Sequence, residues 1–424
     1  MRILIKGGHI YDPANKREGV FDILIGDGTI VKVAKVIKQT VDRTIDAAGL
    51  IVLPGLIDMH AHLREPGRED AETIESGLAA AAAGGFTGVC SMPNTTPVCD
   101  NQGVVEFILD KAKKANSVKV YPIGAITKDR KGKELAEASE LKRAGCVAIS
   151  DDGDSVKDSS IMRRALEYAH MFDLPVVSHC EDRDLSADGV MHEGYISTVV
   201  GMKGIPAAAE STIVARDLQL AEFTGARLHI AHVSCKESLE LIRMAKAKGV
   251  RVTCETCIHY LVFCDEDVKT FDTNFKMNPP LRSAEDREVL RKALKDGTID
   301  VISTDHAPHI ESAKDVEFDY APFGIIGLET AIPALSTELV AKKIIGWRHI
   351  AEMMSRHPSE IIGIDKGTLG EGKDADITII DPHRQWVYEK EKIKSKSKNS
   401  PFIGYAFEGK VKYTIIEGNI VFAE

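Results

Sequence analysis

The middle of the chain alternates apolar, β-branched runs with segments of helical periodicity. Eight strand-like runs stand out: Leu50–His60, Phe86–Met92, Val118–Ile126, Cys146–Asp151, Pro175–His179, Arg227–His232, Arg251–His259 and Val301–Asp305. A regular strand–helix alternation is typical of a parallel sheet, and eight such units are the number that closes into a barrel. The pattern therefore predicts an α/β protein with a (β/α)8 barrel of the TIM type.

Helix boundaries can be predicted from capping residues between these runs. Pro206 suits a first helical turn, and Gly225 suits the end of the same helix. Ser234 and Glu237 have the spacing of a capping box, which predicts a helix that starts there and stops at Gly249.

Both chain ends have a different pattern, with short alternating segments separated by Gly and Asp turns. This pattern is typical of β-strands joined by tight turns. Neither end has enough apolar residues for a core of its own. We therefore expect residues 1–53 and 366–424 to pack together as one small β-sandwich domain, beside a catalytic barrel of residues 54–365.

Composition limits the classes of function. The 424 residues carry a formal net charge of −10, so no general basic field is available for nucleic acid or an acidic membrane surface. No uninterrupted apolar run of about 18 residues and no signal-peptide pattern occurs. Most of the eight cysteines lie in or next to strand-like runs, which favours reduced core thiols in a cytoplasmic protein. We read Cys254-x-x-Cys257 in the same way.

Polar residues gather at the ends of five predicted strands. They are His60 and His62 after the first run, Asp151 and Asp152 after the fourth, His179 after the fifth, His229 and His232 in the sixth, and Asp305, His306 and His309 after the eighth. The carboxyl ends of barrel strands meet at one rim, where barrel enzymes build their sites. Five strands that each deliver His or Asp to one rim predict a metal site.

The ligand types indicate which metal and which chemistry. Imidazole and carboxylate without thiolate suit Zn²⁺, with Mn²⁺ or Co²⁺ as substitutes. Charge balance favours two zinc ions over one. The positive charge that the carboxylates leave would be reduced by a bridging hydroxide and by an anionic substrate. A metal lowers the pKa of bound water to about 7, and Asp305 is placed to take the proton and pass it to a leaving nitrogen. Arg64 continues the alternation of His60 and His62, so we expect a cation beside the metal. The predicted reaction is hydrolysis of an amide-like carbonyl, or its reverse.

Several longer motifs resemble a known family. They are His60–Gly67, Gly84–Thr87, Met92–Pro97, Ser150–Gly153, Asn278–Arg282, Thr304–His309, Pro322–Ile325 and Gly327–Thr330. Nearly the whole chain resembles the amidohydrolase superfamily, and within it the dihydroorotases of the longer bacterial type. The resemblance implies reversible cyclisation of N-carbamoyl-L-aspartate to L-dihydroorotate, the third step of pyrimidine synthesis.

The resemblance also implies roles for individual residues. One metal would be held by His60, His62, Asp152 and Asp305, and a second by Asp152, His179 and His232, with Asp152 bridging. Asp305 would be the general acid and base. The substrate carboxylate would contact Arg64, Asn94 and His309, with His62 also facing the substrate. The ring amides would contact Asn278 and the backbone of Phe323 and Gly324.

The residues alone leave some of these roles open. Asn94 and Asn278 both precede or follow prolines, and either suits a turn as well as a ligand. His309 could equally lie in a surface loop. The polar segment 310–320 can fold over the substrate as a lid, or can be a plain exposed connection. Cys257-Ile258-His259-Tyr260 departs from the Thr-Pro-His-His that relatives often show, which puts a contact from the seventh strand in doubt.

Two other functions compete with the first. One is hydrolysis of a different cyclic amide, such as a hydantoin or allantoin. Those relatives usually have a carbamylated lysine at the end of the fourth strand, and Ala148–Asp152 contains no lysine. The other is a non-catalytic subunit that scaffolds aspartate transcarbamoylase, although such chains typically lack the metal ligands. We expect a homo-oligomer, and the sequence leaves a transcarbamoylase partner open.

Overall fold

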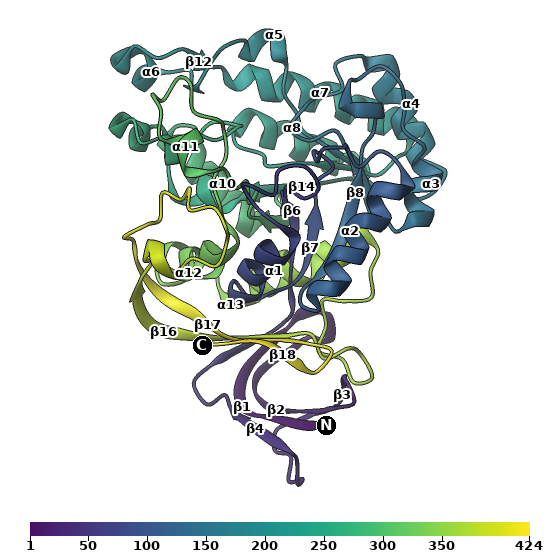
Figure 1. Ribbon diagram of the computed structural model, residues 1–424, viewed down its shortest axis with the longest axis vertical. Coiled ribbons are helices and arrows are strands. Elements are labelled where there is room, and N and C mark those ends of the chain that lie inside the picture. Colours follow the sequence, from purple (N-terminus) through teal and green to yellow (C-terminus); the bar gives the residue numbers. More distant parts are fainter.

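The computed structural model describes residues 1–424, which form two closely packed parts. Figure 1 shows a barrel of strands surrounded by helices, and a strand-rich part at one end of the molecule where both termini lie. No helix has the length and apolar character needed to cross a membrane.

The predicted barrel is confirmed. Its strands pair in chain order and in parallel. They are β6 (Leu56–Ala61), β7 (Phe86–Ser91), β8 (Lys119–Gly124), β9 (Ala148–Ser150), β10 (Val176–Ser178), β13 (Leu228–Ile230), β14 (Val252–Cys257) and β15 (Val301–Ser303). A parallel bridge between Ala61 and His306 closes the ring, and the His62 N–H donates to the His306 carbonyl at 2.8 Å. The strand ends therefore face one rim.

Helices cover the outside of the barrel. The longer ones are α1 (Ile74–Ala83), α2 (Gln102–Ala115), α3 (Ala138–Ala144), α4 (Ser159–His170), α7 (Ala207–Thr224), α8 (Lys236–Ala247) and α10 (Ala284–Asp296). Shorter elements are α5 (Arg183–Ser186), α6 (Tyr195–Val200), α9 (Ile258–Val262), α11 (Glu311–Lys314), α12 (Ala331–Leu335), α13 (Trp347–Ala351), α14 (His357–Ile362), β11 (Met191–His192) and β12 (Gly204–Ile205).

Of the two predicted helix caps, the structure confirms that of α7 and contradicts that of α8. Helix α7 starts directly after Pro206 and ends at Gly225, whose φ of 68° is left-handed, so that prediction is confirmed. The capping box at Ser234 is wrong. Helix α8 follows Cys235, and the buried Ser234 instead donates its hydroxyl to Glu210 on α7. The Ser234 hydroxyl therefore makes a tertiary hydrogen bond instead of the helix cap that the local spacing predicted.

The two chain ends form one continuous sheet in the order β18-β17-β16-β5-β1-β2-β3, with β4 beside β1. Its strands are β1 (Arg2–Asp12), β2 (Arg17–Gly26), β3 (Thr29–Ala34), β4 (Arg43–Asp46), β5 (Ile51–Pro54), β16 (Ile377–Val387), β17 (Ala406–Ile416) and β18 (Asn419–Ala423). The antiparallel pair β5–β16 joins the two ends of the chain. Figure 1 shows β16 and β17 between the barrel helices and the N-terminal strands.

Two apolar cores lie on opposite sides of this sheet. Ile3, Val52 and Ile377 belong to a cluster of the terminal strands alone. Ile380 and Val411 belong to the large cluster of barrel-strand and helix residues. The sheet therefore has a core of its own and is also fixed against the barrel.

The predicted first strand, Leu50–His60, is two strands. It divides at Gly55, so that β5 belongs to the terminal sheet and β6 to the barrel. A Cβ at Gly55 would collide with the Thr87 side chain on β7, which explains why glycine stands at the crossing point.

The polar segment between β16 and β17, residues 388–405, leaves the sheet. In Figure 1 it is the yellow loop that extends beside the barrel above α12. The Ile326 N–H donates to the Asn399 carbonyl at 2.9 Å, and the Ser395 hydroxyl donates to Glu72. This part of the predicted terminal range thus contacts the barrel.

Candidate active site

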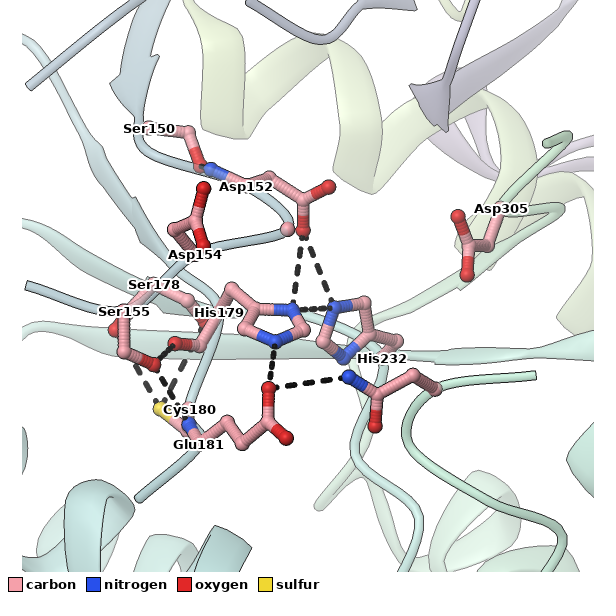
Figure 2. A network of polar contacts seen from close by, with 12 residues as sticks. Ser150, Asp152, Asp154, Ser155, Ser178, His179, Cys180, Glu181, His232 and Asp305 are labelled. Atoms are coloured by element: carbon pink, nitrogen blue, oxygen red, sulfur yellow. Dashed lines mark hydrogen bonds and ion pairs between the residues drawn. The ribbon is translucent and has the colours of Figure 1, made fainter. Parts of the chain in front are cut away.

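The strand ends bring the six predicted metal ligands into one cluster, with the Asp152 carboxylate at its centre. Asp152 Oδ1 lies 3.4 Å from His179 Nδ1 and 3.2 Å from His232 Nε2, and Figure 2 shows this pair facing the carboxylate. Asp152 Oδ2 lies 3.4 Å from His60 Nε2 and 3.5 Å from His62 Nε2. Each oxygen of one carboxylate thus faces its own pair of imidazoles.

Asp305 completes the cluster on the side of His60 and His62. Its Oδ1 lies 3.1 Å from His62 Nε2 and 3.6 Å from His60 Nε2. The residue follows β15 with a left-handed φ of 46°, in the turn that carries its side chain to the rim. Asp305 is buried, as are the other five residues of the cluster.

Three side chains behind the cluster hold the outer nitrogens of its histidines. Glu255 Oε1 lies 2.6 Å from His60 Nδ1, and Asn94 Oδ1 lies 2.8 Å from His62 Nδ1. Glu181 Oε2 lies 3.1 Å from His179 Nε2, as seen in Figure 2. Oxygen acceptors in these positions leave the inner nitrogens free to bind a metal, which is the usual support for a ligating histidine.

Electrostatics at the cluster favour a cation. Burial opposes protonation of His60, but Asp152, Glu255 and Asp305 outweigh it and hold its pKa well above the ordinary value. Burial likewise opposes ionisation of Asp152, but His60, His179 and His232 hold its pKa well below the ordinary value. His60 Nε2 is buried, points into the cluster and has no hydrogen-bond partner. These shifts show that carboxylates surround the histidines and favour a positive charge between them. A metal ion would supply that charge and would also accept the lone pair of His60 Nε2, so the residues fit a metal.

A polar cavity of ≈ 230 Å³ opens beside the cluster. All predicted substrate-binding residues line it: His62, Arg64, Asn94, Asn278, His309, Phe323 and Gly324. Of its fourteen lining residues only two are hydrophobic, which suits a small polar substrate.

Comparison with known proteins identifies the family of this chain. A family model described as dihydro-orotase-like matches residues 49–238. The dihydroorotase of Acetivibrio thermocellus is 55% identical over 422 residues, covering 100% of this chain and 99% of the relative. That of Geotalea daltonii is 53% identical, covering 99% of each chain. The chain belongs to the dihydroorotase family.

Solved structures of cyclic amide hydrolases share the fold of this dihydroorotase-family chain. An L-hydantoinase from Arthrobacter aurescens superposes with a TM-score of 0.88 at 25% identity, over 99% of this chain and 95% of the other. A D-hydantoinase structure superposes with a TM-score of 0.85 at 26% identity, over 100% of this chain and 96% of the other. The chain is a cyclic amide hydrolase of the amidohydrolase type.

Arg64 reaches the dihydroorotase cavity by a route that the strand pattern did not predict. Strand β6 ends at Ala61, and Arg64 has a left-handed φ of 61° in the following turn. Its Nε donates to the Pro308 carbonyl at 3.1 Å. The expected alternation past His62 is therefore wrong, although the guanidinium does line the cavity.

Of the two asparagines with open roles, Asn94 binds the cluster residue His62 and Asn278 binds Glu181, which supports His179. Asn94 accepts from His62, as described above, and Asn278 Nδ2 donates to Glu181 Oε2 at 3.1 Å. Since both also line the cavity, neither is only a turn residue.

His309 is neutral and held by backbone groups. Its Nε2 donates to the Phe323 carbonyl at 2.8 Å. Burial, with Arg64 and Lys314 nearby, lowers its pKa to about 3. His309 therefore presents a neutral imidazole to the cavity. The alternative, that His309 lies in a surface loop, does not describe its position.

Three residues of the cavity were not predicted: Gly153, Arg183 and Ala307. Arg183 begins α5 and donates to the Gly153 carbonyl at 2.8 Å. It stands in an ordinary polar run after His179, so nothing in its local sequence distinguishes it from a surface arginine.

Neighbours of the proposed ligands make structural hydrogen bonds. Asp151 accepts from the backbone of Ile126 and Thr127. His229 Nδ1 lies 2.8 Å from Thr253 Oγ1. His306 accepts from the Gly327 N–H at 3.2 Å.

Near the seventh strand, Cys257 and His259 join Asp305 in a second group whose ligand atoms lie within 4.8 Å of one another. His259 is buried and its Nε2 has no partner. All eight cysteines are buried and unpaired, including Cys254 and Cys257.

The predicted lid segment, residues 310–320, is anchored at two points. Lys314 and Phe318 are buried, and Lys314 Nζ donates to the Pro322 and Gly324 carbonyls at 2.9 and 3.1 Å. Closure of this segment over substrate stays a prediction.

Proposed function

We propose that the chain is a metal-dependent dihydroorotase that interconverts N-carbamoyl-L-aspartate and L-dihydroorotate in pyrimidine synthesis. The observation that carries the proposal is the Asp152 carboxylate between two imidazole pairs, with Asp305 and the Arg64-lined cavity beside it. On this proposal residues 54–365 form the catalytic domain and the two chain ends form its companion domain.

The metal that fits best is zinc, in two positions. His60, His62, Asp152 and Asp305 would hold one ion, and Asp152, His179 and His232 the other. Nitrogen and oxygen ligands without thiolate support this choice. Zinc bound there would supply Lewis-acid polarisation of the amide carbonyl and would acidify water.

The chain's own residues then bind and orient the substrate. The Arg64 guanidinium suits a carboxylate because its donors match two oxygens at once. Burial lowers the Arg64 pKa to about 10, which still leaves it charged at neutral pH. Asn94 and His309 would share this carboxylate. Asn278 and the Phe323–Gly324 backbone would contact the ring amides.

Asp305 moves the proton. In ring opening the water oxygen bonds to the carbonyl carbon and the ring carbon–nitrogen bond breaks. Asp305 takes the proton of the water and gives it to the leaving nitrogen. Ring closure runs through the same steps in reverse.

We further propose that the chain forms a homo-oligomer, and we treat association with aspartate transcarbamoylase as a hypothesis. Size measurement of the purified chain, with and without an aspartate transcarbamoylase, tests both.

The deciding experiment combines metal analysis with a ring-opening assay. Purified protein reconstituted with zinc should open dihydroorotate much faster than hydantoin or allantoin. Preference for hydantoin or allantoin would favour the other cyclic amide hydrolases. Zinc-loaded protein that opens none of the three would favour a scaffolding subunit.

A further inference from the structure

Asn399 lies in the segment between β16 and β17, far in sequence from every residue of the proposed site. It is buried, with 5% of its surface exposed. Its Nδ2 donates to the Ala307 and Gly324 carbonyls, both at 3.1 Å. Its Oδ1 accepts from the His309 N–H at 3.1 Å. The side chain therefore uses both donors and its acceptor on two loops of the substrate cavity.

These two loops also contact each other directly, because His309 Nε2 donates to the Phe323 carbonyl at 2.8 Å and the Ala307 N–H donates to the Ile325 carbonyl at 2.7 Å. Asn399 adds its three side-chain hydrogen bonds to these two. One loop follows β15 and carries Ala307 and His309, and the other carries Phe323 and Gly324. A further backbone bond joins the Ile326 N–H to the Asn399 carbonyl at 2.9 Å. An amide with two donors and one acceptor is the side chain that can link two carbonyls and one N–H at once.

The segment that carries Asn399 is itself fixed. The Ser397 hydroxyl donates to the Ala71 carbonyl at 2.6 Å, and the Lys396 N–H donates to Glu72 at 3.0 Å. The Lys394 N–H donates to Glu329 at 2.9 Å. Because the barrel binds the segment at three residues just before Asn399, the backbone that carries Asn399 is fixed next to the two loops.

We propose that Asn399 is a positioning residue of the substrate cavity, which sets His309 and the Phe323–Gly324 backbone at the spacing that substrate binding needs. The inference rests on the proposed function, because those groups are the proposed contacts for the carboxylate and the ring amides. Asn399 touches none of the six metal ligands in its hydrogen bonds. Its loss should therefore affect substrate binding and leave the metal in place.

The test compares Asn399→Ala with Ser400→Ala in the zinc-loaded protein. Ser400 is a matched control because it is buried in the same segment but its hydroxyl only accepts from the Phe402 N–H of that segment. Asn399→Ala should raise KM for dihydroorotate by about tenfold or more, since small misplacements of binding groups weaken productive binding strongly. Zinc content should equal that of wild type, and kcat should change much less than KM. Ser400→Ala should leave KM within about twofold.

Asn399→Asp provides a second measurement if the alanine variant does not fold. A carboxylate can still accept from the His309 N–H but cannot donate to the two carbonyls, so KM should rise here too. An unchanged KM in either folded Asn399 variant would overturn the inference, and so would an equal rise in Ser400→Ala. If neither Asn399 variant folds, the residue is structural and the inference is overturned. Wild-type protein without dihydroorotate turnover would instead overturn the proposed function, and the positioning role with it.

Discussion

Asp152 gives the site its symmetry, because one carboxylate serves two pairs of histidines. Strand ends that gather His and Asp at one rim are visible in the sequence, since barrel topology brings them together whatever the loops do. The clustering of these six residues could therefore be predicted. Asn399 could not, because it stands among lysines and serines in a run that looks like an exposed linker.

Replacement of the proposed general acid and base tests the chemistry. Asp305→Ala should abolish ring opening, by roughly 100-fold or more, because no other group is assigned to carry the proton to the leaving nitrogen. Circular dichroism should show an intact fold. Turnover within about tenfold of wild type would exclude this role for Asp305.

Arg64 can be separated from the chemistry by kinetics. Arg64→Ala should mainly raise KM, because the lost guanidinium binds the carboxylate in both ground and transition states. Arg68→Ala is the control, since the exposed Arg68 pairs with Asp70 at 3.2 Å and does not line the cavity. An unchanged KM in Arg64→Ala would count against the assigned contact.

Glu255 binds the outer nitrogen of His60, so replacement of Glu255 should change the affinity of the site for metal. Glu255→Gln should weaken zinc binding by about 10- to 100-fold, measured by competition with a chelator. Glu72→Gln is a matched control, because Glu72 is buried against His306, which is not a proposed ligand. Equal zinc affinity in the Glu255 variant and wild type would remove it from the metal site.

At the scale of elements, the strands were predicted better than the points where they start and stop. Apolar runs mark all eight barrel strands, but the split at Gly55 depends on Thr87 from the next strand. The start of α8 depends on Glu210 from α7. The undivided first strand and the early start of α8 were both predicted wrongly because tertiary contacts, which local residue spacing does not reveal, decide these boundaries.

The segment around α11 predicts a pH dependence of stability. Burial, with Lys276 nearby, lowers the Lys314 pKa to about 7. Unfolded lysine keeps its proton to a pH of about 10.4, so from pH 7 upward the unfolded state binds more protons and the free energy of unfolding rises with pH. Lys314→Met should lose this rise.

Denaturant unfolding between pH 7 and about 9.5 measures the difference. The exposed Lys38→Met variant is the control and should follow wild type. Parallel curves for Lys314→Met and wild type would contradict the predicted titration of Lys314.

At the scale of the whole molecule, metal binding and folding should be linked. The proposed ligands come from five strands that span Leu56 to Ser303, so only the folded chain can bring them together. Each zinc ion at about 100 times its Kd should stabilise the fold by about 2.7 kcal/mol, and chelation should lower the Tm. Magnesium prefers oxygen ligands and should give no comparable shift. A Tm that does not respond to zinc would contradict the site.

The pairing of β5 with β16 has a consequence for synthesis on the ribosome. Strands β1 to β5 emerge first, yet their partner β16 follows more than three hundred residues later, on the order of tens of seconds at the usual rate of chain growth. Asn399 emerges later still. The nascent chain would thus assemble its ligand-bearing barrel before the last stretch arrives to brace the substrate loops, so a prematurely terminated polypeptide could bind zinc and yet capture substrate poorly.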